Sequence, residues 1–356
     1  RAATEDLVGV VGEPERGVLG HRIGRRSDDI ERAIELFFRI LAITPIADAS
    51  LLEACRHVEP LLAQADRRGD RLDVLERLAI LEQEPDVKWH VLGEAARLAT
   101  DLEEDDRAIW SWEGRIETRP GDPEALDGLV TLFDKAKRWR PLIDILNKRA
   151  AKEDRFTEQR RADRVRVARI LADNLDASEE AIDTWRDIEE RFGHSDDGTK
   201  ALTQLLRAMQ RWTELAEHLT GAADRAPNAT DKAETLRELG DVQREQLDEL
   251  RGAIVSYESS LMADPRNEGA RQGLRALIKK VELRPEVVRV LLAAFVAADD
   301  WRLVLDLTEH RLMAAADFAH GSITPTVALE QVAILMESAE ISEQRADEPD
   351  AAFALV

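Results

Sequence analysis

From Asp28 onward, apolar residues recur every three or four positions, in blocks separated by short polar segments. This spacing places the apolar side chains on one face of an α-helix. The segments between blocks include residues 119–123 and 263–267, which contain prolines that do not continue a helix. The pattern therefore predicts an all-α fold of paired helices joined by short turns.

A marker made of alanine, isoleucine and an aromatic residue four positions after the alanine recurs along the chain. It begins at four positions: Ala33, Ala108, Ala181 and Ala253. The intervals are 75, 73 and 72 residues, and a second marker at Trp139, Trp212 and Arg284 recurs after 73 and 72. Two markers with one period indicate a repeat array, in which each unit buries its apolar face against its neighbours.

Each unit of about 73 residues divides into four helices, which in the second unit are expected near 88–100, 105–119, 123–136 and 138–151. The alanine allows two helices to approach closely, and the aromatic residue fills the space beside it. We therefore predict core positions for the recurrent aromatic residues: Phe37, Trp112, Trp185, Tyr257, Trp139 and Trp212.

The residues of this marker resemble the tetratricopeptide repeat (TPR) family. The best match is Ala253, Tyr257, Leu261, Pro265 and Asn267, and the next is Ala108, Trp112, Ile116, Pro120 and Asp122. The alternate hairpins match less well, and the charged residues with which some members hold a partner's C-terminal carboxylate are not found. The resemblance implies a right-handed α-solenoid of stacked helix hairpins, with about four and a half double repeats and a groove that binds protein.

The predicted array covers residues 29–356, with double repeats near 29–87, 88–160, 161–232, 233–298 and a partial one at 299–356. Residues 1–28 are glycine-rich and are expected to be an irregular linker or lead-in. Pro60 implies either a kink or a shifted hairpin boundary in the first unit. An additional helical segment is expected around Trp301. Because the chain begins with Arg1 and ends in an apolar stretch, we expect a fragment of a larger repeat protein.

The composition narrows the choice of partner. With 50 Lys and Arg against 72 Asp and Glu, the net charge is −22, which argues against a nucleic-acid or anionic-membrane surface. The longest apolar run, residues 290–298, is too short to span a membrane. A soluble chain is therefore expected, with the cytoplasm favoured and the compartment left open. The preference for Arg over Lys, with abundant Ala, is typical of a GC-rich bacterial coding sequence.

The sequence contains no complete motif for catalysis, phosphate binding or metal binding. Residues 12–17 have the glycine spacing of a phosphate loop, but Val18 and Leu19 replace the lysine and hydroxyl residues that would contact phosphate and magnesium. The acidic run 103–106 is interpreted as a loop before a helix, and Cys55 as a buried, inert thiol. We therefore predict no catalytic, cofactor-binding or metal-binding residues, and no enzyme activity in this chain.

Three aromatic residues fall outside the core register. Trp110 and Phe38 stand beside the core marker at positions where other units carry mostly charged residues, and Trp89 begins a helix. Aromatic residues at otherwise polar positions are the type that anchors interfaces, although a neighbouring segment can equally cover them. Trp110, Phe38 and Trp89 are thus the candidate partner-binding residues, with burial by the protein itself as the alternative.

These expectations combine into a non-catalytic scaffold or adaptor for protein–protein interaction. Its partner would be a protein or peptide, and the acidic surface would steer a basic segment toward it. The alternative is the targeting or regulatory arm of an enzyme or transcriptional regulator whose active domain lies outside this chain. The identity of the partner and the oligomeric state stay open.

Overall fold

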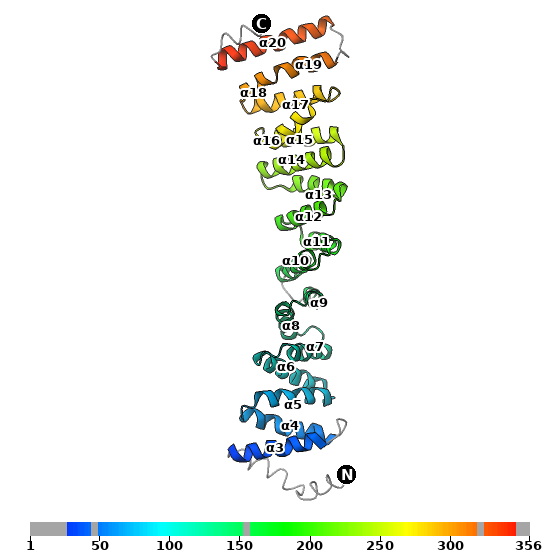
Figure 1. Cartoon of the computed structure of the whole chain (residues 1–356), viewed down its shortest axis with the longest axis vertical. Helices are drawn as coiled ribbons and strands as arrows, with labels where there is room; N and C mark the ends of the chain where they lie inside the picture. The colour runs from blue at the N-terminus through cyan, green and yellow to red at the C-terminus, as the bar shows by residue number, and fades with distance from the viewer. Residues whose placement is uncertain (1–26, 44–48, 152–156, 319–323, 347–356) are drawn as a thin grey trace. The chain divides into compact units, whose positions relative to one another are not determined.

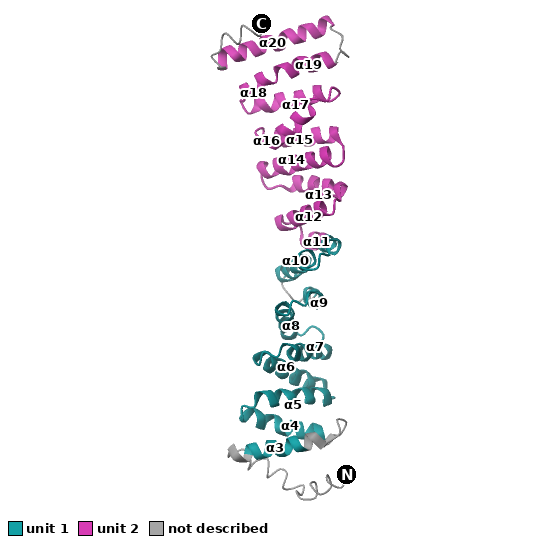
Figure 2. Cartoon of the chain, in the orientation of Figure 1, with its two compact units in different colours: residues 1–184 teal, residues 185–356 magenta. Residues whose placement is uncertain are grey.

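The computed structural model describes residues 27–43, 49–151, 157–318 and 324–346, and all regular secondary structure in these ranges is α-helical (Figure 1). The chain divides into two compact units, residues 1–184 and 185–356 (Figure 2). The first unit contains α3 (Ser27–Ile43), α4 (Ala49–Gln64), α5 (Arg68–Leu81), α6 (Pro85–Asp101), α7 (Asp105–Thr118), α8 (Pro123–Lys135), α9 (Trp139–Ala150) and α10 (Thr157–Asp173). The boundary falls within α11 (Ser178–Phe192).

The second unit continues with α12 (Asp196–Ala208), α13 (Trp212–Arg225), α14 (Ala229–Glu245), α15 (Leu250–Ala263), α16 (Glu268–Leu277), α17 (Arg284–Ala297), α18 (Trp301–Asp306), α19 (Thr308–Phe318) and α20 (Pro325–Ala346). In both units helices that follow one another in the chain pack against each other. The predicted all-α repeat fold is confirmed, and α6 to α9 lie within a few residues of the four helices expected for the second repeat.

Two types of turn alternate along the array. The first type places a residue with positive φ two positions before the next helix, at Asp66, Glu103, Lys137, Asp176, Gln210, Asp248 and Asp299. The second type ends in a side chain that accepts a hydrogen bond from the first turn of the next helix, at Asp122, Ser195, Asn228 and Asn267. Such N-caps satisfy backbone N–H groups that the helix itself leaves unpaired. The alternation repeats after two helices, so a repeat of four helices spans two such periods.

The core follows the predicted register at three of the marker aromatics. Trp112, Trp185 and Tyr257 are buried, and a Cβ added at Gly240 would lie only 2.6 Å from Cε1 of Tyr257. The hydroxyl of Tyr257 donates a 2.6 Å hydrogen bond to Asp241, and burial raises the pKa of the tyrosine. A small residue facing a large ring thus sets the distance between α14 and α15.

Three other aromatics are only half-buried, which corrects the prediction for them. Trp139 and Trp212 are the first residues of α9 and α13, so solvent reaches their rings at the helix ends. Phe37 lies on α3, which packs on α4. The position at a helix end accounts for the exposure of the two tryptophans, whereas Phe37 lies in the middle of its helix and is not explained in this way.

The two local uncertainties of the sequence are also settled. Pro60 lies inside α4, which ends at Gln64, 31 residues after the marker alanine, whereas α8 ends 27 residues after its marker alanine, so the hairpin boundary of the first unit is shifted by four residues. The expected segment around Trp301 forms α18 and α19. The predicted lead-in lies almost wholly outside the described residues.

Candidate functional site

Trp110 occupies a position of the repeat that faces solvent in every unit. The equivalent residues, two positions after the marker alanine, are Glu35, Trp110, Asp183 and Val255, and all four are exposed. Trp110 is 43% exposed and Val255 56%, whereas Trp112 is only 4% exposed. The fold does not require an aromatic residue at this position, because a carboxylate serves equally well in two of the units.

Trp110 lines a surface pocket of about 280 Å³, which we call the Trp110 groove. Its wall and floor come from three consecutive helices. The lining residues are Ala79 and Ile80 of α5, Lys88 and Leu92 of α6, and Trp110, Glu113, Gly114 and Glu117 of α7. Ile80 is 57% exposed, so two large apolar side chains from different helices face solvent around one depression.

Gly114 and Arg107 shape this groove. A Cβ added at Gly114 would lie 3.2 Å from Cδ2 of Leu92, so the glycine allows close packing of α7 on α6. Arg107, three residues before Trp110, donates hydrogen bonds of 2.7 Å to Glu76 and 2.6 Å to Asp73 on α5. The hydrogen bond to Glu76 is the largest cause of a raised pKa for Arg107. These ion pairs hold α5 beside α7 about one helical turn from the groove.

The groove carries unpaired acidic groups. Within the described residues, neither Glu113 nor Glu117 has a cation within salt-bridge distance, and both are exposed. Nearby carboxylates behave differently: Asp105 pairs with Lys135 at 2.8 Å, and Asp106 with Arg138 at 2.6 Å. One lysine, Lys88, lines the groove as well, so the lining has two carboxylates and one ammonium group.

Trp89 is covered by two arginines, one in α7 and one directly after it. The guanidinium carbons of Arg115 and Arg119 each lie 4.2 Å from the centroid of its ring, a distance at which cation–π attraction is favourable. Its indole N–H donates a 3.1 Å hydrogen bond to Asp122, and the side chain is half-buried. Trp89 therefore links the start of α6 to α7 and to the cap of α8.

Phe38 is likewise half-buried, on α3, with the guanidinium carbon of Arg67 5.6 Å from its ring centroid. It does not line the Trp110 groove, and neither does Trp89. The structure therefore does not bring the three predicted residues together, and Trp110 is the one that stands exposed. The sequence analysis did not identify Ile80 as a candidate binding residue. The one feature of the sequence that indicates its exposure is that it falls outside the apolar stripe formed by Leu72, Leu75 and Ala79.

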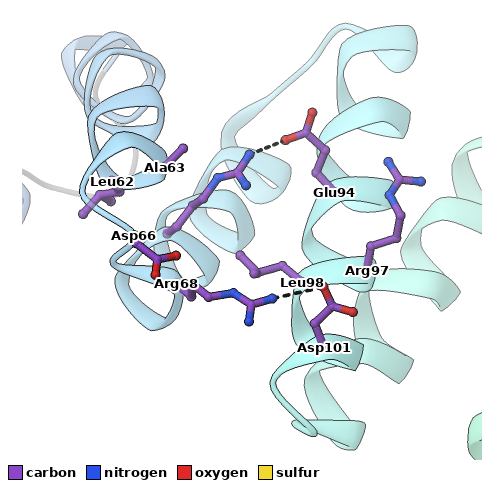
Figure 3. Close-up of a pocket in the computed structure, with 9 residues that line it drawn as sticks. Leu62, Ala63, Asp66, Arg68, Glu94, Arg97, Leu98 and Asp101 are labelled. Carbon is purple, nitrogen blue, oxygen red and sulfur yellow. Dashed lines mark hydrogen bonds and ion pairs between the residues drawn. The ribbon is translucent and has the colours of Figure 1, made fainter. Parts of the chain in front are cut away.

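A second pocket, of about 410 Å³, lies among α4, α5 and α6 (Figure 3). Its charged side chains pair with one another: Arg68 with Asp101 at 3.0 Å and Arg71 with Glu94 at 2.9 Å. Two further charged residues line it: Arg97, which pairs with Glu124 at 2.6 Å, and Asp66. All three arginines of this pocket are therefore already paired, whereas the Trp110 groove carries carboxylates without a cation at salt-bridge distance among the described residues.

The loop-like glycine pattern of residues 12–17 lies outside the described residues, and the other chemistry candidates that the structure describes give no site. Cys55 is buried, and burial raises the pKa of its thiol, which disfavours the reactive thiolate. Among the described residues, no group of three or more His, Cys, Asp or Glu side chains could hold a metal ion. None of the described helices combines the length and the apolar character that crossing a bilayer requires.

No protein-family model matches the chain, and neither does any curated protein. Among solved structures, the chain is similar to YrrB, described as a TPR protein with an unusual peptide-binding site, with a TM-score of 0.30 and 14% identity over 52% of this chain and 91% of YrrB. It is also similar to the C-terminal part of a TPR repeat-containing protein from Cytophaga hutchinsonii, with a TM-score of 0.29 and 13% identity over 72% of this chain and 97% of that one.

A tetratricopeptide repeat protein from Parabacteroides merdae gives a TM-score of 0.29 and 12% identity, over 74% of this chain and 98% of that one. All three are TPR proteins, the family that the sequence resembles. This likeness identifies no ligand.

Proposed function

We propose that this chain is a non-catalytic scaffold for protein–protein interaction and that the Trp110 groove binds a segment of a partner protein. The observation that carries the proposal is the exposure of Trp110 beside Ile80, at a repeat position where two other units have a carboxylate. Tryptophan is enriched among the few residues that dominate binding energies at interfaces. The groove is also concave, so a side chain from a partner can be enclosed on several sides.

The second pocket is a weaker choice, because its arginines and carboxylates already satisfy one another and a ligand would have to break these ion pairs. That Phe38 and Trp89 also contact a partner stays a prediction. Arginine side chains lie over both rings, so a partner would reach only their exposed edges.

The proposal is tested by selecting short random peptides, displayed on phage, for binding to the purified chain. Affinities of the enriched peptides are then measured by fluorescence anisotropy for the wild type, Trp110→Ala and Val255→Ala. Val255→Ala is the matched control, because it removes an exposed apolar side chain from the same repeat position in another unit.

We expect Trp110→Ala to weaken binding by about 2 kcal/mol or more, or roughly thirty-fold, as for a central interface residue. Val255→Ala should leave the affinity unchanged. The proposal is wrong if no peptide is enriched, or if the enriched peptides bind Trp110→Ala as tightly as the wild type.

A further inference from the structure

The charges around the Trp110 groove indicate what kind of segment it takes. Resting on the function proposed above, we infer that the groove recognises a segment of a partner protein in which an apolar side chain stands next to a lysine or arginine. The apolar side chain lies between Ile80 and Trp110, and the cation lies between the carboxylates of Glu113 and Glu117.

The sequence of α7 places these groups in one row. Trp110, Glu113, Gly114 and Glu117 have the spacing i, i+3, i+4 and i+7, and all four line the groove. Residues at this spacing lie on one face of a helix, one turn above another. Because Gly114 has no side chain, the groove is deeper at the middle of the row, where the side chain of Leu92 lies beneath the glycine. The row thus presents an aromatic ring at one end and two carboxylates beyond it.

The two carboxylates are the part of the row that lacks a partner. Like charges four residues apart on a helix destabilise it. Elsewhere in the unit comparable carboxylates are paired across helices, for example Asp86 with Arg119 at 2.5 Å. Within the described residues Glu113 and Glu117 have no such arginine, so a cation supplied by a ligand would relieve the repulsion between them.

The same charges disfavour other occupants. An acidic segment or a nucleic-acid phosphate would add negative charge to a chain that already carries −22. A second copy of the chain docked on the same surface by a two-fold axis would bring Glu113 and Glu117 toward their own equivalents. A lysine or arginine, in contrast, can pair with the carboxylates, and an arginine can also stack on the exposed face of Trp110.

The experiment uses the peptides selected on the wild type, the double variant Glu113→Gln/Glu117→Gln, and a matched double variant, Glu179→Gln/Asp183→Asn. The control also removes two exposed carboxylates four residues apart, on α11, and Asp183 occupies the repeat position of Trp110. Each Trp110-dependent peptide is made a second time with its lysine or arginine replaced by glutamine. Affinities are measured at low and at high salt.

We expect the groove variant to weaken binding about ten-fold at low salt, as for the loss of a charge-assisted pair, and to lose most of the salt dependence. The control variant should change affinity less than about two-fold, because it alters only the long-range field. The peptide lacking its cation should bind wild type and groove variant equally, since the same interaction is already lost.

Two different failures are distinguishable. If the Trp110-dependent peptides are neutral or acidic, or if the groove variant binds them as tightly as the wild type, the cation inference is wrong while the proposed function stands. If peptide binding does not depend on Trp110, the proposed function itself fails, and this inference fails with it.

Discussion

Trp110 and Trp112 are two residues apart on α7, and at ~100° per residue their side chains point about 200° apart. One is exposed and the other is buried, as their positions in the repeat predicted. Trp89 could not be assigned in this way, because its environment depends on Arg115, an arginine that the fold turns inward. Room for the guanidinium group comes from Gly93, where a Cβ would collide with it. A sequence does not reveal which of many arginines is buried.

The two tryptophans should differ sharply in their effect on stability. Trp112→Ala removes a ring that packs against Gly128 of α8, where an added Cβ would lie 2.7 Å from its indole nitrogen. The resulting cavity should cost ~3–5 kcal/mol. Trp110→Ala should cost about 1 kcal/mol or less, because 43% of the residue is already exposed to water. Urea denaturation measures both, and equal losses would mean that Trp110 serves the fold rather than a partner.

At the scale of helices and turns, one turn type is readable from the sequence and the other is not. Asp122, Ser195, Asn228 and Asn267 are residue types that cap helices, so these boundaries could be predicted. The positive-φ turns carry Lys137 and Gln210 among their residues, and neither type favours a turn. There the packing of the flanking helices dictates a backbone conformation that the residue itself does not prefer.

Position 210 allows this imposed conformation to be tested. Gln210 has a φ of +56°, which glycine adopts freely and a β-branched residue adopts only with strain. We expect Gln210→Gly to leave stability unchanged or to raise it by up to about 1 kcal/mol, and Gln210→Val to lower it by about 1–2 kcal/mol.

Gln204, exposed in the interior of α12, is the matched site for the same substitution. Gln204→Gly should lower the free energy of unfolding by about 1 kcal/mol, because glycine loses more conformational entropy than glutamine when it is fixed in a helix. Thermal melts of the variants give the comparison. A similar loss for Gln210→Gly and Gln204→Gly would show that the turn gains nothing from glycine.

Along the described parts of the chain, ion pairs recur between residues about thirty positions apart in sequence. Examples with separations of 28 to 33 residues are Arg119 with Asp86, Arg138 with Asp106, Arg186 with Glu214, Arg207 with Glu238 and Arg289 with Glu258. The net charge of −22 predicted an acidic surface, but a net charge does not show which arginines pair with which carboxylates. Each exposed pair contributes little by itself, about 0–1 kcal/mol, so any effect on stability comes from their number.

Ion pairs with arginines make stability depend on pH in a definite direction. Hydrogen bonds from arginines lower the pKa of four glutamates: the largest contribution comes from an arginine distant in sequence for Glu82 and Glu180, and from one three residues away for Glu214 and Glu234. A carboxylate whose pKa is lower in the folded state stabilises the fold above its unfolded pKa, about 4.3, and this contribution is lost as pH falls through the folded value. We therefore expect the thermal midpoint to fall as pH drops below about 4.3, and less steeply in high salt.

A single pair isolates the cause. Glu180 accepts two hydrogen bonds from Arg140, at 2.7 and 2.9 Å, whereas among the described residues no cation lies within salt-bridge distance of Glu117. Glu180→Gln should lower the thermal midpoint at neutral pH by at most a few degrees and leave it unchanged in acid, where the wild-type carboxylate is protonated as well. Glu117→Gln should not lower it at either pH. If the two variants melted alike at neutral pH, or if the wild-type midpoint fell mainly between pH 7 and 6, the inter-hairpin ion pairs would not be the source of the pH dependence.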